Sequence, residues 1–336
     1  MKLSFSKPWL IPRDIKRQAR ENVAQGKILN IMNDTVFKAV FTDDTEDSRE
    51  ALRLLLSSCT HREISRVQVM NSELLPDYLA GKSSRLDVHA TFNDGDAANL
   101  EIQIDKSGDD LKARAAFYAA RLLSAQAKKG ETYGEIKRVY QIFFLNCVLF
   151  PQSDKLPRRY FMMEEDEHDK LNEVMEIIFY EMPKLEQKVQ EYFAGEKELR
   201  RENLQREEKW CIYMKYRHEA KAQGLIAELC REEGIMQAER ALTKVSRDYE
   251  KWARTLYREK AEMDYRSGMY TARKEGIAEG KVVGIAEGKV AGIAEGSAKG
   301  YEQASFEIAR KMKARGRPLG EIIEDTGLAP EIVEKL

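Results

Sequence analysis

The sequence has no excess of charge of either sign, since 56 Lys and Arg stand against 57 Asp and Glu. A net charge of −1 provides no overall basic field of the kind that marks many nucleic-acid-binding proteins. No run of about 18 apolar residues occurs, so we expect no membrane-spanning helix. Pro8, Pro12 and charged residues interrupt the amino-terminal region, which therefore lacks the continuous apolar stretch of a signal peptide.

Cysteine is scarce, and its four residues lie far apart. None has a second Cys or His at the spacing of a zinc site, and His168 and His218 are equally isolated. We therefore predict neither a zinc site nor a disulfide framework, and no small-molecule cofactor. The pattern is typical of a protein in the reducing cytoplasm.

The chain has 336 residues, a length greater than one compact domain usually needs. Charged residues make up 34% of it and hydrophobic residues 43%. Its first 27 residues hold seven Lys and Arg against Asp14 and Glu21. We treat residues 1–29 as a basic amino-terminal arm. Such an arm either contacts phosphates or is a disordered terminus.

Residues 30–184 alternate between helical and strand patterns. Helices are expected at 33–41, capped by Asn33, at 47–58, and from a Ser107 cap to Gly130. Strands are expected at 64–70, in a hairpin within 85–104, and at 138–149, 158–164 and 174–181. This order predicts a mixed α/β domain.

The composition shifts after Lys184. Residues 185–275 are rich in Glu, Lys, Arg and Ala, and we predict several helices there. Residues 301–336 are predicted to form a small unit of two or three short helices. Their arrangement resembles half of a helix-turn-helix, so this unit is either a helical cap or dimerisation element, or a DNA contact.

Between these helical regions lies a repeat, GIAEGKVV, GIAEGKVA and GIAEGSAK, within residues 276–300. Glycine falls at every fourth position, which on an α-helix gives a slowly winding smooth stripe that a second helix could approach closely. Each glycine also costs a helix about 1 kcal/mol relative to alanine. The repeat is therefore either a self-associating helix or a flexible segment.

The hairpin within residues 85–104 carries acidic side chains on the polar side of its alternation. With a turn of about five residues, Asp87 would face Gln103 or Asp105, and Glu101 would lie one or two pairs further along. Two carboxylates at that range can share Mg²⁺, which prefers oxygen ligands and keeps several waters. The alternative is an ordinary half-buried hairpin, because such hairpins alternate in any case.

Several segments of the chain resemble the Rpn family of recombination-promoting nucleases and transposases. These segments are NDTVFKAVF, RLDVHA, NLEIQI, the helix with Arg114 and Tyr118, Gly130 and Tyr133, IIFYEMPKL, the GIAEG repeats and TGLAPEIVEKL. The resemblance covers about residues 30–184 strongly and the remainder more loosely. It implies a PD-(D/E)XK restriction-endonuclease-like core, a mixed sheet flanked by helices, followed by a mainly α-helical carboxy-terminal region.

The resemblance also implies roles for individual residues. Asp87 and Glu101 would bind Mg²⁺, with Mn²⁺ as a substitute. Gln103 occupies the lysine position of the superfamily motif, as is typical of the family, and Leu86 stands where the superfamily has proline. These assignments make Asp87, Glu101 and Gln103 candidate catalytic residues.

Two further pairs of residues have roles implied by the same resemblance. Asp34 would be the acidic residue of the first helix, and Lys38, one turn later, is a candidate replacement for the missing lysine. Arg114 and Tyr118 either contact phosphate or brace the site.

The function implied is an Mg²⁺-dependent DNA endonuclease linked to recombination or mobile DNA. The alternative is a catalytically degenerate nuclease fold that acts as a DNA-binding or oligomerising protein. In both cases DNA is the expected partner, and we expect homo-oligomers to form through the helical and repeat-containing tail.

Overall fold

The computed structural model divides the chain into two compact units, Met1–Glu259 and Lys260–Leu336. The residues that the structure describes are 11–70, 73–74, 84–85, 87–93, 95–103, 110–126, 132–193 and 204–336. Within these ranges, no helix is both long enough and apolar enough to cross a membrane.

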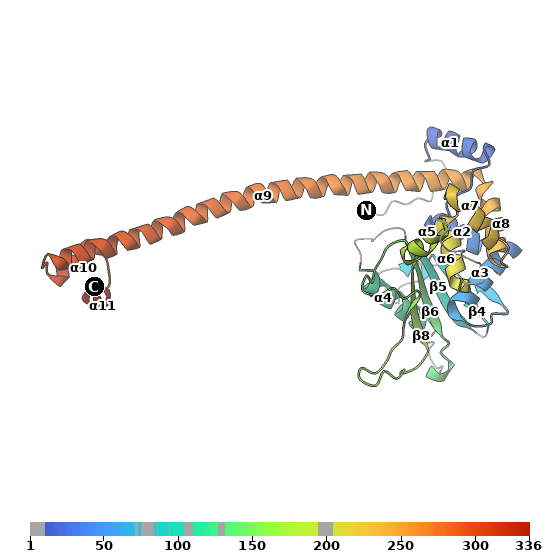
Figure 1. Ribbon diagram of the computed structural model, residues 1–336, viewed down its shortest axis with the longest axis horizontal. Coiled ribbons are helices and arrows are strands. Elements are labelled where there is room, and N and C mark those ends of the chain that lie inside the picture. The colour runs from blue at the N-terminus through green and yellow to red at the C-terminus, as the bar shows by residue number, and fades with distance from the viewer. Residues whose placement is uncertain are drawn as a thin grey trace. The chain divides into compact units, whose positions relative to one another are not determined.

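The first unit is a mixed sheet with helices on both faces (Figure 1). Its helices are α1 (Arg13–Ala24), α2 (Asp34–Thr42), α3 (Glu46–Thr60), α4 (Leu111–Ser124), α5 (Glu186–Phe193), α6 (Arg206–Tyr216), α7 (Gln223–Leu229), α8 (Ile235–Ser246) and the start of α9 (Tyr249–Ala314). Its strands are β1 (Val67–Val69), β2 (Glu73–Leu74), β3 (Ser84–Arg85), β4 (Val88–Phe92), β5 (Asp96–Gln103), β6 (Val139–Leu145), β7 (Arg158–Tyr160) and β8 (Met175–Glu181).

Six strands form the main sheet in the order β1-β4-β5-β6-β8-β7, while β2 and β3 pair separately. The pairs β1–β4, β4–β5 and β7–β8 are antiparallel, and the central pairs β5–β6 and β6–β8 are parallel. Every residue of β6 is buried. This burial explains why residues 138–149 read as a continuous apolar run, since helices cover both faces of a parallel sheet.

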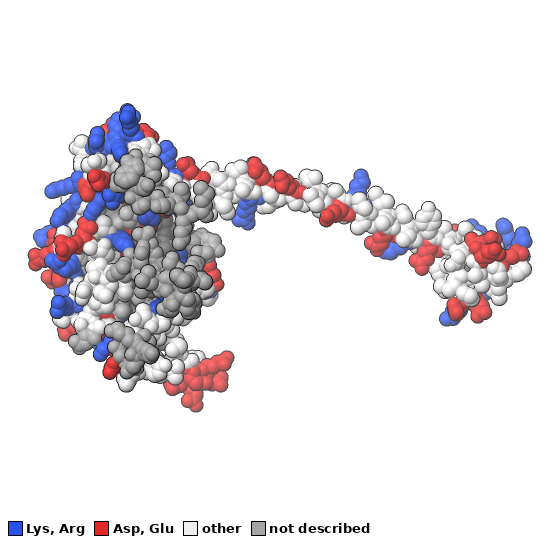
Figure 2. Space-filling model, turned by 180° about the vertical axis from the view of Figure 1, so that it is seen from behind, with Lys and Arg blue, Asp and Glu red and all other residues white. Residues whose placement is uncertain are grey.

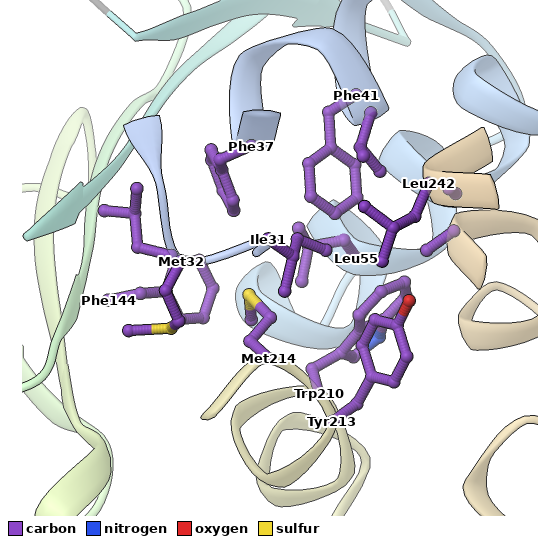
Figure 3. Packing of buried hydrophobic residues seen from close by; sticks show 14 of the residues in the cluster. Ile31, Met32, Phe37, Phe41, Leu55, Phe144, Trp210, Tyr213, Met214 and Leu242 are labelled. Atoms are coloured by element: carbon purple, nitrogen blue, oxygen red, sulfur yellow. The ribbon is translucent and has the colours of Figure 1, made fainter. Parts of the chain in front are cut away.

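The larger core lies on the face of the sheet covered by α2, α3, α6 and α8 (Figure 3). Phe37 and Phe41 of α2 lie with their ring centroids 4.8 Å apart and their planes tilted by 58°, and the ring of Phe37 is 6.2 Å from that of Phe144 on β6. Fully burying one such side chain stabilises the fold by about 1.5–3 kcal/mol. These contacts hold α2, and with it Asp34, against the sheet.

The opposite face is covered by α4. Phe143 and Phe179 stack there at 5.3 Å and pack with Leu111 and Ala115 of the helix. The predicted architecture, a PD-(D/E)XK-like mixed sheet flanked by helices and followed by a helical region, is confirmed.

The first two helices after the amino-terminal segment begin at side-chain caps. The Asn33 side chain accepts a hydrogen bond from Thr35 N at 3.0 Å and begins α2, as predicted. Thr45 does the same for α3, accepting from Ser48 N at 3.2 Å. Such caps satisfy backbone donors that the first helical turn leaves unpaired.

The predicted register of the hairpin is wrong. Val88 pairs with Leu100 and Phe92 with Asp96, which leaves only residues 93–95 for the turn. Asn93 at φ 48° and Gly95 at φ 112° adopt left-handed backbone conformations that close a tighter turn than the one expected. Asp105 lies outside the described residues.

The cap of α4 also differs from the prediction. Asp110 caps this helix, accepting from Lys112 N at 3.0 Å and Ala113 N at 3.3 Å, and α4 begins at Leu111. The helix ends at Ser124. The expected cap Ser107 and the expected end Gly130 lie outside the described residues.

The basic amino-terminal segment is not disordered over its described part, residues 11–29. Within it α1 buries Ile15 and Ala19 in the main core, because these two residues lie four apart on one helical face. Its Lys and Arg side chains face outward, and Figure 2 shows them gathered over this helix.

The boundaries of the compact units differ from the predicted segments. Helices α5 to α8 and the beginning of α9 pack into the same core as the sheet, with Trp210, Leu242 and Trp252 among the buried residues. Apolar residues scattered among many charges were enough to join residues 204–259 to the first unit. The division therefore falls after Glu259 rather than at the composition shift after Lys184.

In the second unit, α9 contains the whole glycine repeat in helical conformation, and residues 262–304 are all solvent-exposed. Two short helices come after it, α10 (Leu319–Thr326) and α11 (Pro330–Lys335), as predicted. Ala309, Ile322 and Val333 form a small core that holds them to the end of α9.

Candidate active site

The site lies where β4 begins and β5 approaches its end. Asp87 stands one residue before Val88, and Val88 pairs with Leu100. Continuing this register by one residue sets Asp87 opposite Glu101. Residues directly opposite each other on antiparallel strands have Cα atoms about 4.5–5.5 Å apart. The two acidic residues are thus closer than the predicted register implied.

The surroundings of Asp87 disfavour the ionised form of its carboxyl group. Burial first, and then the negative charge of Asp34, raise the pKa of the Asp87 carboxyl to about 6. A hydrogen bond from the Ile102 backbone and the positive charges of Lys38 and Arg114 act in the opposite direction. The sheet therefore holds this carboxylate in place while its surroundings favour its neutralisation by a proton or a cation.

Glu101 is more strongly affected, because only 3% of it is exposed. Burial, followed by the charge of Asp87, raises the pKa of the Glu101 carboxyl to about 8. Its Oε2 accepts a hydrogen bond from Arg114 Nη2 at 3.2 Å, and its Oε1 accepts one from Asn99 Nδ2 at 3.0 Å. Both oxygens of this carboxylate are consequently fixed in direction.

Asn99 and Gln141 are site residues that the sequence reasoning missed. Both are fully buried beneath α4, and Asn99 Nδ2 also donates to Gln141 Oε1 at 3.0 Å. The available signal was a polar residue two positions before Glu101, on the same face of the strand. Buried amides of this kind orient an acidic side chain through hydrogen bonds, as outer partners of metal ligands do.

Asp34 occupies the first turn of α2, and its charge reaches Asp87. Lys38, one turn later, lies close enough for its charge to lower the pKa of Asp87. The structure thus brings Asp34 and Lys38 to the same place as Asp87 and Glu101, although these residues lie 49 to 67 positions later in the sequence.

Gln103 shares a sheet face with Glu101, because the two are two residues apart on β5. It is half-buried, and its backbone carbonyl accepts from Asn146 N at 2.8 Å. Tyr118 lies further along α4, with its ring centroid 6.0 Å from Arg114 Cζ. Gln103 is therefore a neighbour of the paired carboxylates. Tyr118 contacts Arg114, which in turn donates to Glu101.

The acidic residues of this arrangement are few for a divalent metal site. Among the described residues, no three His, Cys, Asp or Glu side chains are close enough together to hold an ion by themselves. Mg²⁺ does not require such a cage, since it is usually bound through one or two carboxylates, waters and substrate phosphates. The pKa of both carboxyls is raised by burial and by a neighbouring negative charge, that of Asp34 for Asp87 and that of Asp87 for Glu101. A cation would stabilise such a pair, so Asp87 and Glu101 fit Mg²⁺.

A mixed sheet flanked by helices, with acidic residues on two adjacent strands and a third on α2, is the arrangement of a nuclease-like domain. Residues 31–272 match the family described as PD-(D/E)XK nuclease family transposase. The chain belongs to this family, which agrees with the resemblance noted in the sequence. No match was found among curated proteins or among solved structures.

Proposed function

We propose that this protein is an Mg²⁺-dependent DNA endonuclease that acts in recombination or on mobile DNA. The observation that carries the proposal is the pairing of Asp87 with Glu101, two carboxylates whose pKa values are raised by burial and by nearby negative charge. Family membership supports it, since the family is one of nucleases and transposases.

In this proposal Asp87 and Glu101 hold the metal, and Asp34 assists. Mg²⁺, when bound, polarises a phosphoryl oxygen and lowers the pKa of water. Arg114 and Asn99 orient Glu101, while Gln103 positions water or substrate beside it. Lys38 supplies positive charge near Asp87, in the region where the superfamily lysine would act.

Cations on the same face of the sheet support DNA as the partner. Lys112 Nζ lies 4.9 Å and Arg158 Cζ lies 4.6 Å from the ring centroid of Phe150. Neither cation forms an ion pair with a residue in the described part of the chain. Both are therefore available for the phosphate contacts that dominate DNA affinity.

The sheet register relates Arg158 to the acidic pair. Arg158 pairs with Phe179, Phe179 with Phe143, and Phe143 with Glu101, so all four lie in one row across the sheet. Three strand spacings of about 4.8 Å put Arg158 roughly 14 Å from Glu101. A DNA strand that passes along this row could contact both. Figure 2 shows acidic side chains elsewhere, gathered at the tip of the β7–β8 connection, where the sequence reads EEDEHD.

The test is plasmid nicking by the full-length protein. Supercoiled DNA is incubated with Mg²⁺, and EDTA and Asp87→Asn serve as negative controls. Asp154→Asn is the matched variant, because Asp154 is an exposed acidic residue far along the chain from the site. We expect nicking that needs both Mg²⁺ and Asp87 but not Asp154. Equal nicking by Asp87→Asn would refute the assignment.

The alternative, a degenerate nuclease fold that binds DNA or oligomerises, is favoured by one observation, the glutamine at position 103 where the superfamily has lysine. It predicts DNA binding without nicking. A filter-binding or fluorescence-anisotropy measurement alongside the nicking assay separates the two functions, because only the enzyme converts the bound plasmid.

We also propose that the tail joins copies of the chain. Along α9, Ile277, Val282, Ile285, Val290 and Ile293 are between 60% and 70% exposed. Figure 2 shows this helix as a largely uncharged surface with acidic and basic side chains at intervals. Deleting residues 276–300, about seven helical turns, should lower the mass measured by light scattering. An unchanged mass would contradict self-association.

The expected cellular compartment is the cytoplasm. All four cysteines are free, and Cys59 and Cys211 are buried. Free thiols persist in a reducing compartment. Localisation of a tagged chain by fractionation would check this proposal.

A further inference from the structure

Arg258, in the third turn of α9, contacts the candidate site from 224 residues away in sequence. Its Nη2 donates to Asp34 Oδ2 at 2.6 Å, and its Nη1 donates to the hydroxyl of Thr35. The next residue, Glu259, accepts from the Asn33 side chain at 3.3 Å. Two consecutive residues of α9 therefore contact the beginning of α2.

This contact completes the restraint of the Asp34 carboxylate. Its Oδ1 accepts from Thr35 N at 2.6 Å and from the Thr35 hydroxyl at 3.2 Å, within the same helix. Its Oδ2 is held by Arg258. Without Arg258, Oδ2 would have no partner among these groups, and the carboxylate would be held through Oδ1 alone.

We propose that Arg258 is a positioning residue of the metal site, and that it sets the orientation in which Asp34 assists the binding of a divalent cation. The inference rests on the proposed function insofar as Asp34 belongs to that site. It extends the site to α9, which the sequence analysis assigned to a separate helical region.

The chemistry of the contact requires an arginine. The planar guanidinium offers donors in a fixed fork, and Arg258 uses two of them for two different acceptors, Asp34 and Thr35. A lysine would keep the positive charge, but all of its donors lie on one nitrogen and are not held in a planar fork. Groups that hydrogen-bond a metal-ligating carboxylate commonly affect metal affinity by roughly 10–100-fold.

The packing of α9 does not depend on this contact. Trp252, Ala253 and Thr255 are buried in the preceding turns, and Trp252 Nε1 donates to Ser246 O at 2.8 Å. Lys251 forms an ion pair with Asp43 at the far end of α2. Substituting Arg258 should therefore leave the helix in place.

The experiment is a calorimetric titration of the full-length protein with Mn²⁺ alone, in the absence of DNA. We expect Arg258→Ala to weaken Mn²⁺ binding by roughly 10-fold, with Arg258→Lys intermediate. The control is Arg254→Ala, one turn earlier on the same helix, where the Arg254 side chain is 55% exposed and pairs with Glu250 at 3.4 Å as its one ion-pair partner among the described residues. This control should bind Mn²⁺ like the parent.

A second comparison separates positioning from a general effect on folding. Asp34→Asn should weaken Mn²⁺ binding, and adding Arg258→Ala to it should cause no further loss, because the arginine acts through Asp34. Thermal unfolding without metal monitors the fold of each variant. Parent-like Mn²⁺ affinity in Arg258→Ala, or additive losses in the double variant, would overturn the inference.

The outcomes also distinguish this inference from the proposed nuclease activity. If Mn²⁺ binding depends on Asp87 and Arg258 but no DNA is cut, the endonuclease is refuted and the positioning role stands. If DNA is cut in an Asp87-dependent manner while Arg258→Ala binds Mn²⁺ normally, the positioning role is refuted. A parent chain that binds no Mn²⁺ would refute both.

Discussion

Arg114 on α4 lies 3.2 Å from the Glu101 carboxylate on β5, so the helix that covers one face of the sheet supplies a cation to the paired acidic residues. The side chain of Arg114 is 20% exposed and that of Glu101 is 4% exposed. In this partly buried setting the arginine favours the ionised form of Glu101, the form that metal binding would require.

Replacing Arg114 with alanine should therefore move the pH dependence of nicking. Without the arginine, the pKa of Glu101 rises above its present value of about 8, so half-maximal activity should require a higher pH. Arg247→Ala, which removes an exposed cation at the end of α8, is the control and should leave the pH of half-maximal activity unchanged. A parent-like profile for Arg114→Ala would contradict this role.

Glu101 should make the metal-free protein less stable as the pH rises. Its pKa is raised from 4.5 to about 8, so between these values the folded state holds a proton that the unfolded state has lost. The free energy of unfolding then falls with increasing pH over this range. Since each pKa unit corresponds to about 1.4 kcal/mol, Glu101→Gln should be at least about 1 kcal/mol more stable than the parent at pH 8.

That expectation is checked by urea unfolding in EDTA at pH 5 and pH 8. The advantage of Glu101→Gln over the parent should be larger at pH 8 than at pH 5. The same advantage at both pH values would show that the substitution acts through packing and not through the titration of Glu101.

Asn99→Leu should destabilise the fold by roughly 1–3 kcal/mol, because it removes the donor that serves both Glu101 and Gln141 in a buried setting. Gln141→Leu removes one of the two acceptors. If the amides act as one network, the double variant should lose less than the sum of the single losses. Strictly additive losses in chemical denaturation would argue that the two amides are independent.

Gln103→Lys introduces the residue of the superfamily motif at its own position. The site at residue 103 is half-buried on the face that Glu101 occupies, so a lysine there could extend towards solvent or towards the carboxylates. We expect unchanged stability and a several-fold faster rate of plasmid nicking, since a cation would stabilise developing negative charge. A slower rate would indicate that the amide itself has a role in the reaction.

Alanine at Gly276, Gly284 and Gly292 should separate helix stability from association. A Cβ built on each of these glycines meets nothing within 4 Å. Each substitution should therefore favour the helix by up to about 1 kcal/mol. If the smooth stripe is a contact surface, the triple variant should gain helicity by circular dichroism and yet lose mass by light scattering. Unchanged mass would place self-association elsewhere on the tail.

The sequence was sufficient to predict elements whose signals are local. Asn33 followed by the apolar stripe of α2 specified that helix, and the apolar run of β6 specified a buried strand. The alternation around Asp87 and Glu101 correctly put both on one face of the hairpin. Their metal-binding roles remain predictions.

Signals that depend on other parts of the chain were missed. A shift of one strand by two residues leaves every side chain on the same face, so the alternation cannot reveal the register. The register depends on the turn, which the left-handed backbone of Asn93 and Gly95 closes. Arg258 reaches Asp34 through the packing of α9 against α2, and no pattern near either residue indicates that contact. The assignment of residues 204–259 to the first unit likewise depended on tertiary packing.

The glycine repeat, fully helical and exposed, has a consequence for how homologous tails could vary in length. Each copy is eight residues, so gaining or losing one by slippage of the repeated coding sequence would change α9 by about 12 Å and rotate its carboxy-terminal end by about 80°. The small core of Ala309, Ile322 and Val333 would move as a whole, with none of its contacts altered. The number of repeat copies would thus set the length of α9 in discrete steps, without a change in any residue of the sheet or of the small core.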